Sequence, residues 1–301
     1  MKTKNFVLVV MLILMSGLFI HGQDLADNEG TGMPGDNFSL EGALDLFVNA
    51  ENLEAFEKAL NEKDNNITNL DLNEDGETDY IKIISQMSED VHIFTLQVPV
   101  SENENQDIAT IFLEKTGKEA AHIQIVGDED IFGEEIIIEP SSEEKDEEVK
   151  KNQNVTNRTN DVVVVNVWQW PSVRYIYSPR YRPYVSPWRW RHYPVWWKPW
   201  RPLGWNVWRP LKVKHYRPKF RTVHFHRSVK AHGVYRTTRV RSTTVQTRYA
   251  PARANYKVTQ TKTTVKGPRG NKVTKKTTKV QGNKGSVKTQ KTKVKRSRKG
   301  G

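Results

Sequence analysis

The stretch from Tyr80 to Val98 reads YIKIISQMSEDVHIFTLQV and decides the fold. Apolar residues alternate with polar ones over residues 80–87 and again over residues 91–98, which is the period-two pattern of strands that bury one face. The three residues between the runs, at 88–90, are all polar. The stretch therefore predicts a β-hairpin with a tight turn.

The sequence on both sides of this hairpin extends the prediction. Three further strand-like runs follow at residues 108–114, 121–126 and 135–139. Before the hairpin, apolar residues recur at three- and four-residue spacing, first after Ser39, which can cap a helix, and again over residues 53–60. Helices followed by hairpin-linked strands predict an α+β fold, in which an N-terminal helical hairpin packs on an antiparallel β-meander.

Charge divides the 301-residue chain into two unlike halves. Residues 23–150 contain 34 acidic and 7 basic residues, whereas residues 151–301 contain 38 basic residues and one acid, Asp161. The two net charges, −27 and +37, combine with Lys2 and Lys4 to give +12 for the chain. All nine Trp lie between residues 168 and 208, and cysteine is absent. This pattern excludes one evenly mixed domain, disulfides and cysteine nucleophiles.

The N-terminus has the pattern of an export signal. Lys2 and Lys4 precede an apolar run at residues 6–20, which predicts a secretory signal peptide cleaved after Gly22, with retention as an anchor the alternative. An exported chain without cysteine is typical of a bacterial envelope, so we expect a periplasmic, outer-envelope or extracellular protein. The predicted divisions are a signal peptide (1–22), a polar leader (23–38), an acidic α+β domain (39–140), a polar linker (141–160), an aromatic Pro/Trp/Arg-rich segment (161–218) and a basic low-complexity tail (219–301).

Residues 71–79 read DLNEDGETD, which matches the DxNxDG start of an EF-hand-like calcium loop. Such a loop directs alternate side-chain oxygens and one carbonyl to a single point. Position 12, usually a bidentate glutamate, is Lys82, so we expect weak binding of Ca²⁺, in the roughly millimolar range. The alternative is an Asx-turn loop that leads into a strand. The candidate calcium ligands are Asp71, Asn73, Asp75, the carbonyl of Glu77, and Asp79.

Several segments carry a resemblance to known proteins. They are the loop at residues 71–76, LQVPV at 96–100, QDIA at 106–109 and IVGDEDIFG at 125–133. Together with the aromatic, basic C-terminal half, they resemble a family of exported bacterial envelope proteins, some of which carry EF-hand-type labels. The resemblance implies an envelope protein with a calcium loop, and it implies no activity.

The aromatic segment is rich in proline. Its prolines exclude a long helix and a central strand, so we expect an extended, polyproline-like ribbon with outward aromatic side chains. Tryptophan with arginine suits a membrane interface, stacking on single-stranded nucleic acid, or packing on sugar rings. The alternative is a ribbon that completes the core of the acidic domain. The residues expected to bind an anionic surface are Trp188, Arg189, Trp190, Arg191, Trp196, Trp197, Trp200 and Arg201.

The basic tail repeats Val/Thr/Lys runs every 14 or 15 residues and contains no acid after Tyr235. This is a weak hairpin repeat without large apolar residues, so we expect disorder or fluctuating hairpins until a polyanion neutralises the lysines. Outside the cytoplasm, such partners include lipopolysaccharide, anionic polysaccharide, a membrane surface and extracellular nucleic acid. The acidic domain is a further partner, within the molecule or between molecules.

No catalytic motif stands out. His224 and His226, with His215 and His232 near them, could bind a transition metal, but scattered histidines are common in basic segments. We therefore predict a non-enzymatic envelope protein whose basic aromatic arm binds an anionic surface polymer or membrane, with a weak calcium loop in the acidic domain. The alternatives are a secreted protein that binds extracellular DNA and a structural protein that assembles by pairing the acidic domain with the basic arm.

Overall fold

The computed structural model describes residues 30–141, 164–214, 219–266, 272–281 and 287–297. The predicted signal peptide, the first seven residues of the leader and nearly all of the linker lie outside these residues. The chain divides into two compact units, one of which is Pro34–Ala250, while the other contains the C-terminal stretch from Pro251. Among the described residues, no helix has the length and apolar character that a membrane span requires.

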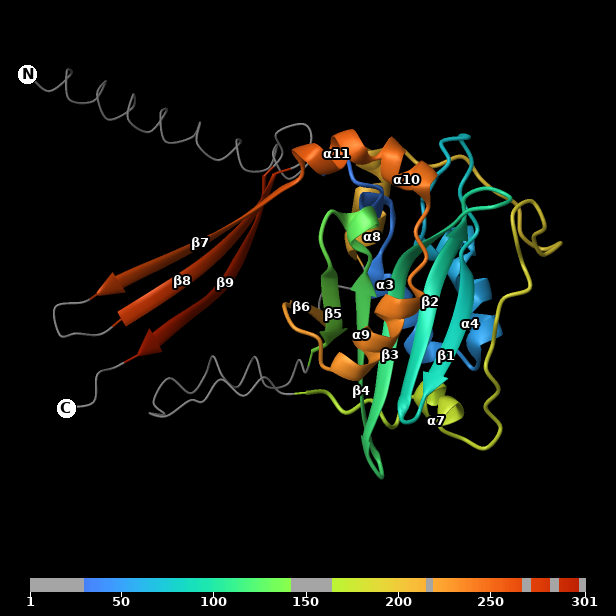
Figure 1. Ribbon diagram of the computed structural model, residues 1–301, viewed down its shortest axis with the longest axis horizontal. Helices are drawn as coiled ribbons and strands as arrows, with labels where there is room; N and C mark the ends of the chain where they lie inside the picture. Colours follow the sequence, from blue (N-terminus) through green and yellow to red (C-terminus); the bar gives the residue numbers. More distant parts are fainter. Residues whose placement is uncertain (1–29, 142–163, 215–218, 267–271, 282–286, 298–301) are drawn as a thin grey trace, which may run out of the picture. The chain divides into compact units, whose positions relative to one another are not determined.

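A six-stranded antiparallel sheet forms the centre of the larger unit (Figure 1). The strands lie side by side in sequence order, so the first five form the predicted meander. The sharp turn between the first two strands uses Glu89, whose φ of 53° is left-handed. The strands are β1 (Lys82–Ser88), β2 (Val91–Pro99), β3 (Asn105–Gly117), β4 (Ala120–Gly127), β5 (Ile136–Pro140) and β6 (Phe220–Val223).

Three helices cover one face of this sheet, namely α3 (Leu40–Asn49), α4 (Leu53–Leu60) and α7 (Pro171–Ile176). Helix α3 begins after Ser39, whose Oγ accepts a hydrogen bond from the Gly42 amide at 3.1 Å. The rings of Phe47 and Phe56 meet edge to face at 5.3 Å, and Phe94 of β2 lies 5.1 Å from Phe47. This apolar layer is the main core, and the α+β class agrees with the prediction.

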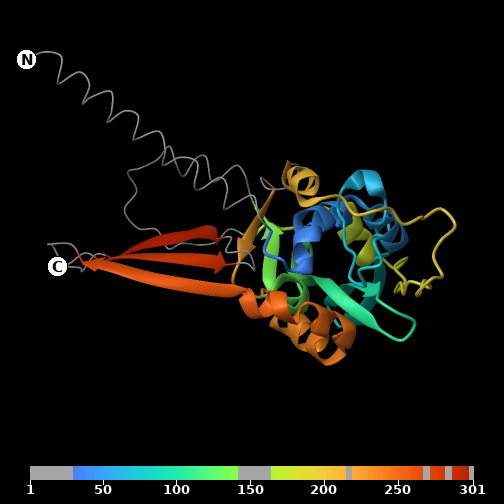
Figure 2. The same cartoon turned by 90° about the horizontal axis from the view of Figure 1, so that it is seen from above.

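Helix α9 (Val229–Thr238) covers the opposite face, so the sheet lies between two helical layers (Figure 2). A smaller apolar cluster joins Ile93 and Phe112 of the sheet to Ala231 and Tyr235 of the helix. The rest of this face is polar. The remaining short elements are η1 (Pro34–Asn37), η2 (Lys63–Asn65), α5 (Glu129–Phe132), α8 (Trp205–Lys214), α10 (Thr243–Arg248) and α11 (Ala250–Asn255).

The described part of the C-terminal half departs from the expected ribbon and disordered tail. Residues 164–214 and 219–250 form helices and a strand, and they belong to the same unit as the acidic domain. Strand β6, which lies in the predicted tail, pairs with β5 and completes the sheet. Residues on both sides of residue 140 therefore belong to one compact unit. The segment covers polar side chains of the sheet and strand edges that would otherwise be exposed. Neither kind of contact requires apolar residues at a regular spacing in the sequence.

The C-terminal unit contains three antiparallel strands, β7 (Lys257–Lys266), β8 (Lys272–Gln281) and β9 (Val287–Ser297). They coincide with the Val/Thr/Lys runs of the repeat. In the register of β7 and β8, Val258 lies opposite Val280 and Val265 opposite Val273. The glycine-rich turns between these strands lie outside the described residues.

Candidate functional site

The candidate calcium loop is closed by its own side chains. The two carboxylate oxygens of Asp71 accept hydrogen bonds from the amides of Asp75, at 3.1 Å, and Gly76, at 2.9 Å. Glu74 and Gly76 both have left-handed φ angles, 57° and 85°. Asp75 in turn accepts from the amide of Glu77. The loop thus has the Asx-turn geometry that the sequence indicated, and Lys82, at position 12, starts strand β1.

Two neighbouring segments hold this loop in place. The Thr78 amide donates to the Trp200 carbonyl at 2.8 Å, and the Trp200 amide donates back to Thr78 Oγ1 at 3.1 Å. On another side, the Tyr249 hydroxyl donates to the Asp71 carbonyl. Burial, together with the charges of Asp71 and Asp75, raises the pKa of Asp79 well above its usual value. A cation near these carboxylates would relieve that repulsion.

The connection between α7 and α8, residues 177–204, runs along strand β1. The Ser85 amide donates to the Tyr184 carbonyl, and the Ser186 amide donates to the Ile83 carbonyl, both at 2.9 Å. Ser186 Oγ also donates to the buried carboxylate of Glu57, whose pKa burial raises. The connection therefore protects what would otherwise be an open sheet edge.

The eight residues expected to bind an anionic surface divide into two sets. Trp197 is 7% exposed and packs against Tyr80, with ring centroids 5.1 Å apart. In contrast, Trp196 is 47% exposed. The alternatives left open by the sequence therefore both describe part of this segment: some aromatic side chains complete the core and others face outward. Arg189, Arg191 and Arg201 are exposed, whereas Trp188, Trp190 and Trp200 are half-buried.

Arginines of the C-terminal half pair with carboxylates on the polar face of the sheet. Glu139 of β5, 3% exposed, accepts hydrogen bonds from Arg221 at 2.7 Å and from Arg227 at 2.5 Å. Burial alone would raise the pKa of Glu139, but these two guanidinium groups hold it below its usual value. The Glu139 carboxylate also accepts from the side-chain amide of Gln124 at 3.0 Å. The result is a closed polar network.

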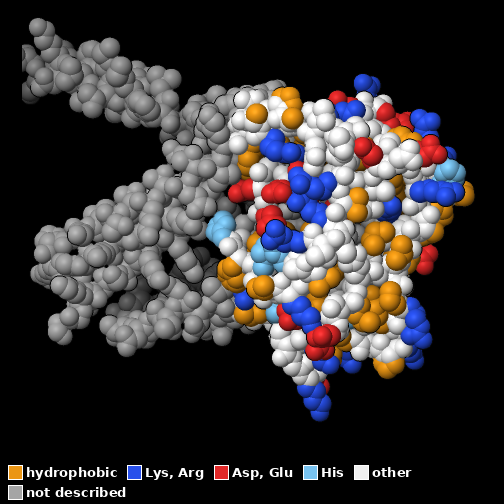
Figure 3. Space-filling model, in the orientation of Figure 1, with side chains coloured by type: hydrophobic (Ala, Val, Ile, Leu, Met, Phe, Trp, Pro, Cys, Tyr) orange, Lys and Arg blue, Asp and Glu red, His pale blue; other side chains and the backbone are white. Residues whose placement is uncertain are grey.

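A second group of pairs lies at the end of β4. Arg239 donates to Asp128 at 2.7 Å, and Arg241 donates to Asp130 at 2.5 Å. Figure 3 shows acidic and basic side chains gathered together on this face. All of these pairs lie within one chain. Part of the charge of the basic half is thus used inside the fold, next to the acidic half.

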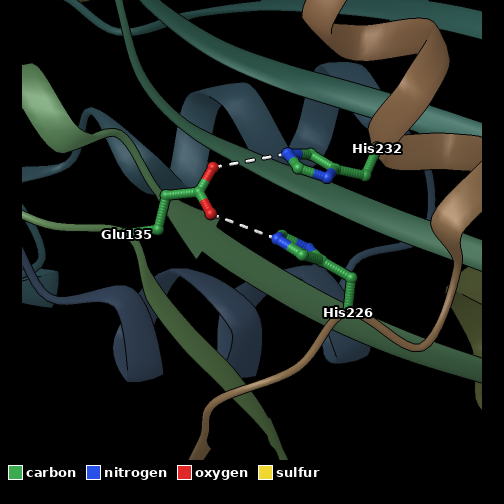
Figure 4. A group of neighbouring side chains, drawn as sticks. All are labelled: Glu135, His226 and His232. Carbon is green, nitrogen blue, oxygen red and sulfur yellow. Dashed lines mark hydrogen bonds and ion pairs between the residues drawn. The ribbon is translucent and has the colours of Figure 1, made fainter.

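Glu135, His226 and His232 form a compact cluster (Figure 4). The Nε2 atom of His226 lies 3.1 Å from one carboxylate oxygen of Glu135, and Nε2 of His232 lies 3.3 Å from the other. The two imidazole rings stack with centroids 3.8 Å apart and an interplanar angle of 12°. Among the described residues, this is the one group of three or more histidine or carboxylate side chains whose ligand atoms all lie within 4.8 Å of one another. The carboxylates of the candidate calcium loop are not gathered as tightly.

A cavity of about 290 Å³ opens beside this cluster. Glu135 and His232 contribute to its wall together with the end of β4 and with polar and charged side chains in and next to α5 and α9. The wall thus combines three carboxylates and one imidazole with two guanidinium groups. Its lining residues are Val126, Gly127, Asp128, Glu129, Glu135, His232, Tyr235, Arg236 and Arg239.

The sequence pointed to some of these residues and missed others. It indicated His226 and His232 as candidate metal ligands, but it grouped them with His224, which is exposed and outside the cluster. Glu135, the third member, lies 91 residues before His226. The pairing of β5 with β6 brings these distant positions together. No local spacing signals such a pairing, so the cluster could be found only from the fold.

No family model, curated protein or solved structure matches this chain. The function must therefore be argued from the residues themselves.

Proposed function

We propose that this protein is a non-enzymatic, exported envelope protein that binds an anionic surface, either a polymer or a membrane, through its basic aromatic half. The observation that carries the proposal is the composition of the α7–α8 connection. Residues 177–204 contain five Arg, one Lys and no acid. All six cations are exposed, and none of them forms an ion pair with a described carboxylate. They are Arg180, Arg182, Arg189, Arg191, Lys198 and Arg201.

The apolar side chains of the same connection support contact with a surface. Val195 is 98% exposed and Trp196 47% exposed, next to the cations at 189, 191 and 198. Indole and guanidinium groups together suit the interface of a membrane or a phosphate-bearing polymer. Hydrogen bonds of Tyr184 and Ser186 with β1, and of Trp200 with Thr78, anchor the connection on both sides of these side chains. This anchoring limits the ordering entropy lost on binding.

The basic tail would contribute long-range attraction to the same surface. Residues 257–301 contain no acidic residue. Attraction between exposed charges decays over about 8 Å at physiological ionic strength. We therefore expect the tail to raise the local concentration of the protein, and the Arg/Trp connection to make the close contacts.

A vesicle-binding experiment on the full chain tests this proposal. Vesicles of equal parts phosphatidylglycerol and phosphatidylcholine are compared with phosphatidylcholine alone, for the wild type and for Arg189→Gln/Arg191→Gln. Each basic residue near an anionic surface contributes about 1 kcal/mol, so the double variant should bind roughly 30-fold more weakly. The matched control is Lys63→Gln/Lys118→Gln, which removes two exposed charges elsewhere and should bind nearly as the wild type does.

A competition experiment separates the proposal from its main alternative. Lipopolysaccharide or an anionic polysaccharide should displace a labelled DNA fragment from the full chain. Failure of both competitors to displace DNA would contradict the proposal and favour the binding of extracellular nucleic acid. If Lys63→Gln/Lys118→Gln lost as much vesicle binding as Arg189→Gln/Arg191→Gln, the α7–α8 connection would be one source of positive charge among many.

We further propose that the loop at residues 71–79 binds Ca²⁺ weakly. Support comes from the raised pKa of Asp79, to which burial and the nearby charges of Asp71 and Asp75 contribute. Calorimetric titration should show heat for the wild type and none for Asp71→Asn/Asp75→Asn. Glu77→Gln is the matched control, because it removes an exposed carboxylate but keeps the carbonyl ligand. Absence of heat from the wild type would contradict the proposal.

A further inference from the structure

We propose that Glu135, His226 and His232 bind a late first-row divalent cation of the zinc class. Two imidazole nitrogens and one carboxylate oxygen make a donor set that such cations accept readily. Ca²⁺ and Mg²⁺ prefer oxygen ligands, and Ca²⁺ takes six to eight of them. The cluster therefore differs in chemistry from the loop at residues 71–79, and the two sites would select different ions.

The distances between the ligand atoms fit a tetrahedral ion. Metal–ligand bonds of about 2.0–2.1 Å to zinc place tetrahedral ligand atoms about 3.3 Å apart. The two imidazole Nε2 atoms lie 3.1 Å and 3.3 Å from the nearest oxygens of Glu135. All three ligand atoms lie within 4.8 Å of one another, so rotation of an imidazole side chain could bring them around one ion without a change of the backbone.

Both rings are turned toward the same carboxylate. Their planes are nearly parallel, at 12°, with centroids 3.8 Å apart, so one ring must rotate before both Nε2 lone pairs can point to one ion. Two positive imidazolium rings at this separation would repel each other strongly. A divalent ion would satisfy both rings and the carboxylate together.

Three ordered elements hold these side chains. Glu135 directly precedes β5, His226 follows β6, its neighbour in the sheet, and His232 lies in α9. Beneath the rings, Phe112 of β3 lies 6.4 Å from His226 and 6.3 Å from His232. His232 lies in a packed helix, and Glu135 and His226 lie one and three residues from paired strands, which limits how far the three ligands can move apart. The site is thus preorganised by the fold.

The cluster leaves room for a fourth ligand. Three protein ligands are the number found in zinc sites that keep an open position. Glu135 and His232 border the cavity of about 290 Å³, and Arg236 and Arg239 lie in the same wall. A bound divalent ion and Arg236 would together make this part of the cavity positive. We therefore expect water or a small anion, such as a carboxylate or phosphate group, as the fourth ligand.

Metal titration of the full chain tests the site. Zn²⁺ is titrated calorimetrically in excess Ca²⁺, which occupies weak carboxylate sites, and Co²⁺ is followed by its visible absorption. The wild type should bind one equivalent saturably, and Co²⁺ should give the intense absorption of a tetrahedral complex. Glu135→Gln, His226→Gln and His232→Gln should each weaken binding at least tenfold.

Two control variants make the result specific. His224→Gln removes an exposed histidine two residues from His226, and His122→Gln removes a histidine that pairs with Glu114 alone, at 3.3 Å. Both should bind Zn²⁺ within about twofold of the wild type. Far-UV circular dichroism checks that each variant is folded, and Zn²⁺ should raise the melting temperature of the wild type but of none of the three ligand variants. The proposal is overturned if the wild type shows no saturable binding or if two of the ligand variants keep wild-type affinity. It is also overturned if the control variants lose as much affinity as the ligand variants.

Discussion

The two faces of the central sheet are covered in opposite ways. On one face, α3, α4 and α7 bury aromatic and aliphatic side chains against the strands. On the other, α9 and the segments beside it cover a face on which Glu139, Asp128 and Asp107 are buried among polar residues. The first face is held by apolar contacts, and the second combines a smaller apolar cluster with arginine–carboxylate pairs. Acidic side chains of the first half and basic side chains of the second half thus form complementary charged surfaces within one fold.

The two faces should also differ in how their stability responds to amino-acid substitution. Apolar burial has no direction and scales with the area removed from water. A buried ion pair contributes little net stability, because desolvation offsets the attraction, yet removing one partner leaves an unpaired charge. We therefore expect the apolar face to set the stability of the unit and the polar face to set which segment can cover it.

The largest expected effect is on the apolar face. Phe94→Ala removes a fully buried ring that contacts Phe47, and such a truncation should cost about 4 kcal/mol of unfolding free energy. Urea unfolding followed by circular dichroism measures this cost. Val195→Ala, at a site 98% exposed, should change the unfolding free energy by less than about 0.5 kcal/mol. Similar costs for the two variants would contradict the assignment of this face as the core.

The next effect breaks one pair on the polar face. Arg227→Leu leaves the 3% exposed Glu139 carboxylate with Arg221 as its one remaining cationic partner, so it should cost about 3 kcal/mol at neutral pH. In Glu139→Leu/Arg227→Leu the unpaired charge is gone, and much of the loss should be recovered. A double-mutant cycle in urea measures the coupling. Strictly additive losses would show that the two side chains do not form a coupled pair.

The same contrast explains which elements the sequence could predict. Strand β2 was expected at residues 91–98 and spans Val91–Pro99, and α3 starts directly after its predicted cap, Ser39. These elements bury apolar side chains on one side, so periodicity marks them. Strand β6, Phe220–Val223, was missed because its partners are the backbone of β5 and the carboxylate of Glu139.

The site residues were predictable to a similar degree. The 71–79 loop is a local motif, so its Asx turns could be expected from nine consecutive residues. The Glu135 cluster depends on contacts between positions 91 residues apart, and His224, which the sequence also indicated, does not take part in it. Charge composition indicated that the halves attract each other. It could not indicate that the attraction is directed to one face of one sheet.

A smaller effect concerns pH and sharpens the contrast further. Burial raises the pKa of Asp107, on the polar face, to about 6, above its unfolded value of about 3.9. The folded state therefore binds this proton more tightly, so the contribution of Asp107 to stability is greatest at low pH and is lost as pH rises through 6. Between about pH 5 and about pH 7 the loss is on the order of 1 kcal/mol. Asp107→Asn should remove this part of the pH dependence, whereas the exposed Asp64→Asn should not. Identical pH profiles of wild type and Asp107→Asn would contradict the prediction.

The smallest effect compares one serine cap on each face. Ser39 caps α3 on the apolar face and Ser228 caps α9 on the polar face, and each Oγ accepts an amide hydrogen bond at 3.1 Å. Because the geometry is matched, Ser39→Ala and Ser228→Ala should each cost about 1 kcal/mol in the same unfolding transition if the two layers fold together. If α9 opens separately, Ser228→Ala will leave the global transition unchanged and will accelerate hydrogen exchange in α9 alone. Ser39→Ala would still lower the global stability. The pair of variants thus measures whether the charged cover is an integral part of the fold or a layer that can detach from it.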